Sequence, residues 1–81
     1  MNKLEFTGLM ASTGMQGREV REDTLLFTTA EDVMLVFTDA FEVIYVTGWK
    51  KGKCFTRSYH SWGAAWEYLP VILENAHEIA E

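Results

Sequence analysis

The stretch "FEVIYVTGWKKGKCFTRSYH", residues 41–60, decides the fold because it has the pattern of two strands joined by a tight turn. Its first half is β-branched and aromatic, and its second half alternates apolar and polar residues, as half-buried strands do. Lys51 and Gly52 lie between the halves, where glycine can take the positive φ of a two-residue turn. The stretch therefore predicts an antiparallel hairpin with Trp49 opposite Cys54.

Two segments before this hairpin also have strand character. The stretch "KLEFTG", residues 3–8, alternates Leu4 and Phe6 with polar neighbours. After a loop-like stretch with two glycines, residues 11–17, the segment "REVREDTLLFT", residues 18–28, can continue as a second strand. The N-terminal third is therefore predicted to add strands to the sheet.

The segment "TTAEDVMLVFTDAF", residues 28–41, has two interpretations. As a helix, it would begin with Thr28 and Glu31 in the spacing of a capping box. As a strand, it would run over residues 33–38 and turn at Asp39 and Ala40. The strand is preferred, because apolar residues at consecutive positions fit a sheet that is covered on both sides.

The C-terminal segment "SWGAAWEYLPVILENAHEIA", residues 61–80, is helical by its apolar spacing of three and four. Ser61 is a suitable N-cap. Pro70 has no N–H to donate to the carbonyl of Trp66, so the helix is expected to kink there or to restart with Pro70 in its first turn. Together these patterns predict one α+β domain, residues 1–81. Its antiparallel meander of four or five strands packs against one C-terminal α-helix kinked near Pro70.

Both faces of this predicted sheet are apolar. A turn at Asp39 and Ala40 would pair Leu35 with Ile44. One face would then collect Val33, Leu35, Phe37, Ile44, Val46, Phe55 and Tyr59, and the other Met34, Val36, Phe41, Val43, Tyr45, Trp49 and Cys54. One helix covers only one face. The second face is therefore expected to be covered either by the N-terminal third or by a second copy of the chain in a twofold homodimer.

The positive charge of this acidic chain is concentrated in the predicted hairpin. The formal net charge is −5, yet four of the seven basic residues lie between positions 48 and 57: Lys50, Lys51, Lys53 and Arg57. Beside Trp49 and Phe55 they could bind a nucleic acid or nucleotide, with an aromatic ring for base stacking. The alternative interpretation is a solvated hairpin whose charges discourage pairing at the sheet edge. Tyr68 falls off the helical stripe and is a candidate exposed anchor for a protein partner.

No pattern in the chain points to catalysis, a cofactor or a metal. Cys54, His60 and His77 are too few for a structural zinc site, and no glycine-rich phosphate loop or nucleophile motif is present. Cys54 and His60 would lie about 20 Å apart along one strand, too far for a nucleophile and its base. No run approaches the roughly 18 apolar residues of a membrane span. The expectation is a cytoplasmic, non-enzymatic protein without a membrane segment.

In size, acidity and lack of catalytic motifs, the chain resembles the small acidic proteins that phages and mobile elements use to inhibit host defence or regulatory proteins. This resemblance is one of type, and it implies an inhibitor of the anti-CRISPR or anti-restriction kind, acting in the host cytoplasm. The leading hypothesis is therefore a non-catalytic protein-binding module. The alternative is a nucleic-acid or nucleotide-binding module that uses the basic hairpin, residues 50–57.

Overall fold

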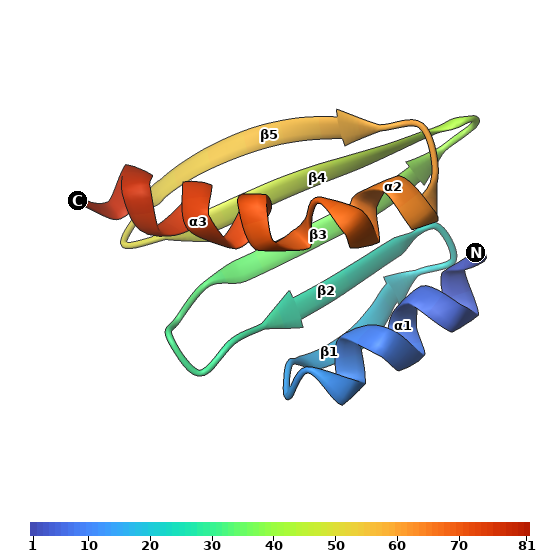
Figure 1. The fold of residues 1–81 in the computed structure, drawn as a ribbon, viewed down its shortest axis with the longest axis horizontal. Coiled ribbons are helices and arrows are strands. Elements are labelled where there is room, and N and C mark those ends of the chain that lie inside the picture. The colour runs from blue at the N-terminus through green and yellow to red at the C-terminus, as the bar shows by residue number, and fades with distance from the viewer.

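The computed structural model describes all 81 residues and contains one five-stranded sheet and three helices. The elements follow in the order α1 (Lys3–Ser12), β1 (Gln16–Arg21), β2 (Thr24–Thr28), β3 (Met34–Ala40), β4 (Val43–Lys50), β5 (Lys53–Tyr59), α2 (Trp62–Glu67) and α3 (Leu69–Ala80). Each strand pairs antiparallel with the next one in sequence, which makes the sheet a meander (Figure 1). The predicted α+β class is confirmed.

The hairpin of β4 and β5 has the predicted register. Trp49 lies opposite Cys54, and Val46 lies opposite Arg57. Lys51 and Gly52 both have positive φ, 53° and 77°, as a two-residue turn of this kind requires. This turn twists in the same sense as the strands that it joins, so the local sequence is sufficient to set the pairing.

The segment before this hairpin is a strand, as preferred, but its turn was predicted in the wrong place. The chain reverses at Phe41 and Glu42, with Phe41 at a φ of 61°, so Leu35 lies opposite Gly48 rather than Ile44. The observed pairing of β3 with β4 therefore differs from the predicted pairing by four residues. Because four is even, every side chain of β3 stays on the face that was predicted for it.

The capping-box spacing at the start of this segment belongs to a turn. Thr29 Oγ1 accepts hydrogen bonds from the backbone N–H groups of Glu31 and Val33, both at 3.2 Å. Asp32 has a φ of 60°, which a continuing helix would not allow. These bonds close the connection between β2 and β3, and the helical alternative is therefore wrong.

The N-terminal segment is a helix, and the predicted strand over residues 3–8 is wrong. Asn2 caps α1 by accepting a hydrogen bond from the N–H of Glu5 at 2.8 Å. Phe6 and Met10, one helical turn apart, are fully buried, whereas Leu4 is 79% exposed. Leu4, which together with Phe6 gave the segment its strand-like alternation, therefore contributes nothing to the core.

The segment predicted as a single second strand is instead a hairpin. It comprises most of β1 and the whole of β2, which are joined at Glu22 and Asp23. The register of β1 against β2 shifts between Glu19 and Arg21, the position of a β-bulge. A bulge on an edge strand disfavours pairing with another sheet.

The C-terminal segment forms two helices rather than one kinked helix. Ser61 caps α2 as predicted, with its Oγ accepting from the N–H of Ala64 at 3.0 Å. Tyr68 separates α2 from α3, and Pro70 is the second residue of α3, where its missing N–H costs no helical bond. The restart alternative is therefore correct. None of the three helices has the length and apolar character needed to cross a membrane.

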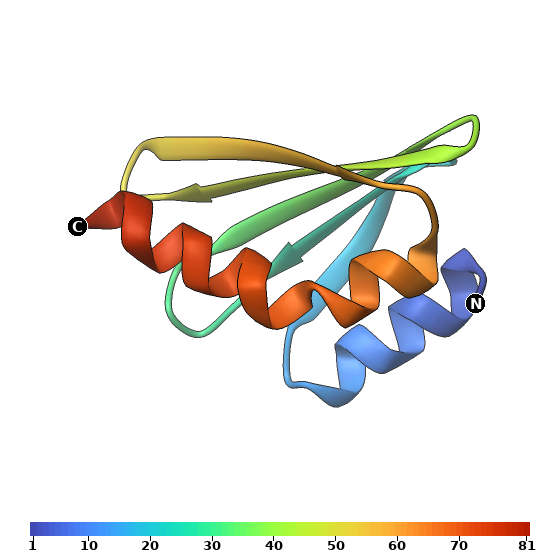
Figure 2. The same ribbon diagram turned by 45° about the horizontal axis from the view of Figure 1, so that its top comes forward.

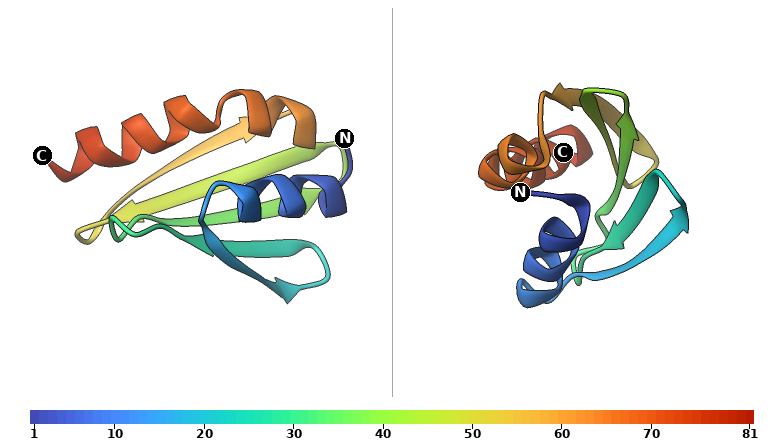
Figure 3. Two further views of the ribbon diagram at one scale, coloured as in Figure 1. Left: turned by 60° about the horizontal axis from the view of Figure 1, so that its bottom comes forward. Right: turned by 90° about the vertical axis from the view of Figure 1, so that its right-hand side faces the viewer.

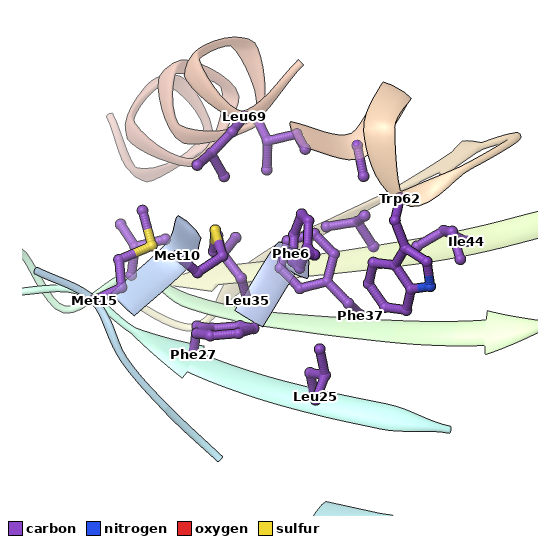
Figure 4. Close-up of a cluster of buried hydrophobic side chains, with 14 of the residues drawn as sticks. Phe6, Met10, Met15, Leu25, Phe27, Leu35, Phe37, Ile44, Trp62 and Leu69 are labelled. Carbon is purple, nitrogen blue, oxygen red and sulfur yellow. The ribbon is translucent and has the colours of Figure 1, made fainter. Parts of the chain in front are cut away.

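All three helices cover the same face of the sheet, as the views in Figures 2 and 3 show. Phe6 of α1 lies near the middle of the core, with its ring centroid 4.9 Å from those of Phe37 and Trp62 (Figure 4). The N-terminal third therefore does not fold over the second face. The covered side is called the inner face below, and the opposite side the outer face.

Candidate functional site

The outer face of the sheet consists of three cross-strand rows, each with one residue from every strand. The rows are Gln16, Thr28, Met34, Trp49 and Cys54; Arg18, Leu26, Val36, Thr47 and Thr56; and Arg21, Thr24, Thr38, Tyr45 and Ser58. The residues between them in β2, β3 and β4 point into the core. No helix packs over these rows, as the right-hand view of Figure 3 shows.

The chemistry of the outer face differs from that of the whole chain. None of the 12 acidic residues belongs to the three rows, and the only charged members are Arg18 and Arg21, both on β1. Six members carry a hydroxyl group from Thr or Ser, and the others include Met34 and Tyr45, which are 37% and 45% exposed. An acidic protein thus presents one face that has no carboxylate and exposes apolar and aromatic groups.

The outer face is hollowed at one edge. A shallow hollow of about 340 Å³ lies along β1 and β2, lined by Gln16, Gly17, Arg18, Leu26 and Thr28. Across the centre, Thr47 and Thr56 place their hydroxyl oxygens 3.5 Å apart. Polar groups that can bind a partner are therefore distributed over the face and not confined to its rim.

The sequence predicted part of this surface. Met34, Val36, Tyr45, Trp49 and Cys54 were assigned to the second face, and they lie in the three rows. The contribution of β1 and β2 was missed, because these strands were treated as one. Glu22 and Asp23 form the turn between these strands. This acidic pair interrupts an otherwise strand-like stretch, and it was the signal that could have revealed the hairpin.

The structure separates Trp49 from the basic residues of the predicted cluster. Trp49 belongs to the outer face, whereas Lys50, Lys53 and Arg57 alternate to the other side. Phe55, the second aromatic proposed for base stacking, is a core residue with 8% exposure. The aromatic and cationic groups required by the nucleic-acid hypothesis therefore do not share one surface.

Lys50 is held by a three-residue network. Its Nζ lies 2.7 Å from His77 Nδ1 on α3, and His77 Nε2 lies 3.0 Å from a carboxylate oxygen of Glu31. A lysine ammonium can only donate, so Nδ1 accepts and the ring proton resides on Nε2, which donates to Glu31. This network connects β4, α3 and the loop between β2 and β3.

Arg57 is also engaged within the protein. Its guanidinium lies 5.3 Å from the centroid of the Phe55 ring, and Nη1 donates to the carbonyl oxygen of Thr56 at 2.9 Å. Lys51 and Lys53, at the hairpin turn, are exposed. Of the four predicted basic site residues, these two have side chains that make no hydrogen bond or ion pair within the protein.

Tyr68 is half exposed, as an anchor residue would be, but its ring also packs within the protein. It stacks on Tyr59 with the ring centroids 5.5 Å apart and the planes 21° from parallel. Burial raises the pKa of Tyr59 above its ordinary value; the positive charge of Arg57 opposes this rise, and Tyr68 adds to it. Tyr68 therefore helps to join the end of β5 to the connection between α2 and α3.

No cluster of metal-ligating side chains is formed. The structure contains no group of three or more His, Cys, Asp or Glu side chains that could hold a metal ion. Cys54 is exposed beside the hairpin turn.

Comparison of the whole chain with known proteins gives no match to any protein-family model, curated protein or solved structure.

Proposed function

We propose that this chain is a non-catalytic protein-binding module and that the outer face is its binding surface. The observation that carries the proposal is the uncovered outer face, with its exposed apolar and aromatic groups and without any carboxylate. The buried centres of protein interfaces are depleted in Lys, Glu and Asp and enriched in Tyr, Trp, Met and Arg. Tyr45, Trp49, Met34, Arg18 and Arg21 provide this composition on one surface.

The resemblance in type to small phage and mobile-element inhibitors suggests what such binding does. An inhibitor of this kind needs a stable contact surface and no reaction chemistry. No acidic residue belongs to the three rows of the outer face, and Glu22, Asp23 and Asp39 lie at its edge beside Arg21. These carboxylates can therefore remain at the surface of a complex. There they would oppose the approach of nucleic acid to the bound partner.

Site-specific photocrosslinking tests this proposal. A benzoylphenylalanine residue at position 47, in the middle row of the outer face, should crosslink to a discrete protein in cells. The same residue at position 4, exposed on α1, is the matched control and should not. The crosslink should survive nuclease treatment.

A pair of charge variants gives a second measurement of the same contact. Thr47→Asp would place a carboxylate in the middle of the outer face and should abolish the crosslink from a neighbouring position such as Thr56. Leu4→Asp introduces the same charge on α1 and should leave the crosslink unchanged. Equal crosslinking from positions 47 and 4, or products that disappear on nuclease treatment, would contradict the proposal, and the second result would favour the nucleic-acid alternative.

A further inference from the structure

An apolar groove lies on the helical side of the molecule, away from the outer face. It has a volume of about 550 Å³ and is lined by Thr13, Met15, Trp66, Glu67, Leu69, Pro70 and Leu73. Its wall includes the last residues of α2 and the first residues of α3, so the groove follows the break between these helices. The loop after α1 supplies Thr13 and Met15.

A second hollow continues this groove. It measures about 230 Å³, shares Thr13, Met15 and Leu73 with the first, and extends to Glu31 and His77. The two hollows are called the helix groove below. Because they share three residues, the two hollows are adjacent, and their lining follows α3 from Leu69 to His77. A chain segment could lie along this part of the helix.

The charges along the helix groove have one sign. Glu67 lines one end, and Glu31 lines the other, where it accepts from His77. No Lys or Arg lines either hollow, although Lys50 donates to Nδ1 of His77, which lines the smaller one. Residues 58–81 contain four Glu and no Lys or Arg. Glu31 is already engaged by His77, so the carboxylate that a positively charged occupant meets without a partner is Glu67.

We propose that the helix groove binds a short basic segment of another protein. An apolar residue of this segment would insert beside Trp66, Leu69 and Leu73, and a neighbouring Lys or Arg would contact Glu67. The volume of the larger hollow lies within the range of roughly 300–1,000 Å³ that is typical of ligand sites. The helix groove is separate from the outer face, so this proposal does not depend on whether a partner binds the outer face.

Fluorescence anisotropy with three short fluorescein-labelled peptides tests the proposal. A peptide of Lys and Leu should bind, whereas a peptide of Glu and Leu, and one of Lys and Ser, should bind at least about tenfold more weakly, because each lacks one of the two required contacts. Glu67→Lys should weaken binding of the Lys-Leu peptide by about tenfold. Glu42→Lys, which makes the same change in charge at the exposed turn between β3 and β4, should change it by less than about twofold. Equal affinity for the three peptides, or equal effects of the two variants, would overturn the proposal.

NMR titration with the Lys-Leu peptide locates the contact. The methyl resonances of Met15 and Leu73 and the indole resonance of Trp66 should shift, while the amides of Thr47 and Tyr45 on the outer face should not. Shifts confined to the outer face would overturn this inference and leave the proposed function standing. Shifts in the helix groove, together with failure of the crosslinking test at position 47, would support this inference and contradict the proposed function.

Discussion

The close approach of Phe55 to Gly48 shows how a residue without a side chain shapes the inner face. A Cβ atom on Gly48 would lie 2.6 Å from Cε1 and 2.7 Å from Cζ of Phe55, and 3.2 Å from Cδ2 of Leu35. β4 has a paired strand on each side, so its backbone cannot move away from this contact. The ring of Phe55 therefore packs where only glycine leaves room.

We expect Gly48→Ala to lower the free energy of unfolding by about 1–3 kcal/mol, the usual effect of overpacking in a core. Gly8→Ala is the matched control. Gly8 lies within α1, and a Cβ there would meet nothing within 4 Å. It should raise the free energy of unfolding by roughly 0.5–1 kcal/mol, because alanine is the better helix former. Urea unfolding of both variants measures the difference, and a destabilised Gly8→Ala variant would contradict this account of the two sites.

Tyr59 gives the fold a sensitivity to alkaline pH. Burial raises the pKa of its hydroxyl in the folded state, in spite of the opposing charge of Arg57. The folded protein therefore holds this proton more tightly than the unfolded chain, whose tyrosines ionise near pH 10. The resulting stabilisation is complete below about pH 10 and is lost as the pH rises through the folded-state pKa.

We expect the protein to lose stability as the pH rises above about 10, and Tyr59→Phe to reduce this loss. Thermal unfolding at a series of pH values measures this loss, and absorbance at 295 nm follows tyrosine ionisation directly. Identical pH profiles for the variant and the natural chain would show that Tyr59 is not responsible.

At the scale of elements, α1 shows why a short alternating pattern is ambiguous. Over residues 3–8 the apolar residues Leu4 and Phe6 fit a strand, but Phe6 and Met10 equally fit one stripe of a helix. Lys, Leu, Glu and Met all favour helices, and Asn2 provides the cap. The helix forms because its two buried residues fill the space beside Phe27, Phe37 and Trp62.

The start of α2 depends on one hydrogen bond. α2 has only six residues, which is too few for a helix to be stable by itself. The Oγ of Ser61 satisfies the N–H of Ala64 at 3.0 Å. The cap therefore fixes where the chain leaves β5 and how Trp62 enters the core.

We expect Ser61→Ala to lower the free energy of unfolding by about 1 kcal/mol, the usual cost of losing an N-cap. Ser58→Ala, at an exposed position of β5, removes a hydroxyl that makes no hydrogen bond within the protein and should change stability by less than about 0.5 kcal/mol. Chemical unfolding measures both changes. Equal effects of the two substitutions would contradict the role given to the cap.

At the scale of the whole molecule, the arrangement is asymmetric. The helices cover the inner face, and the sheet curves around them, as the right-hand view of Figure 3 shows. The outer face is left as a convex surface with no covering element. A partner that binds this face would meet the sheet directly. We propose a second copy of the chain, related by a twofold axis, as one such partner.

We expect this self-association to depend on concentration, because two convex faces touch mainly at their centres and bury less area than two flat ones. Sedimentation equilibrium over a hundredfold range of concentration measures it. Thr47→Asp, which places like charges at the centre of the contact, should shift the equilibrium to monomer, and Leu4→Asp should not. A single 9.3 kDa species at all concentrations would exclude the second copy and leave a different protein as the expected partner.

The sequence by itself determined those features that depend on neighbours along the chain. The hairpin register around Lys51 and Gly52 and the start of a helix after Ser61 follow from local turn and cap chemistry. Pro70 marked the break in the helix, but the sequence did not decide between a kink and a restart. The division of apolar residues of β3, β4 and β5 between two faces follows from the twofold alternation of a strand. It remained correct although the turn before β4 was predicted two residues too early, because this displacement moves the register by an even number.

Only the tertiary structure decided which face is covered, and with it where a partner can bind. α1 and α3 lie on the same side because Phe6 of α1, Phe37 of β3 and Ile72 of α3 belong to one buried core. No pattern of neighbouring residues predicts that these distant side chains pack together. The network of Lys50, His77 and Glu31 joins residues that are 27 and 46 positions apart. Contacts of this kind depend on the packing of distant segments, and for this reason the engagement of Lys50 and the uncovered outer face became visible only in the fold.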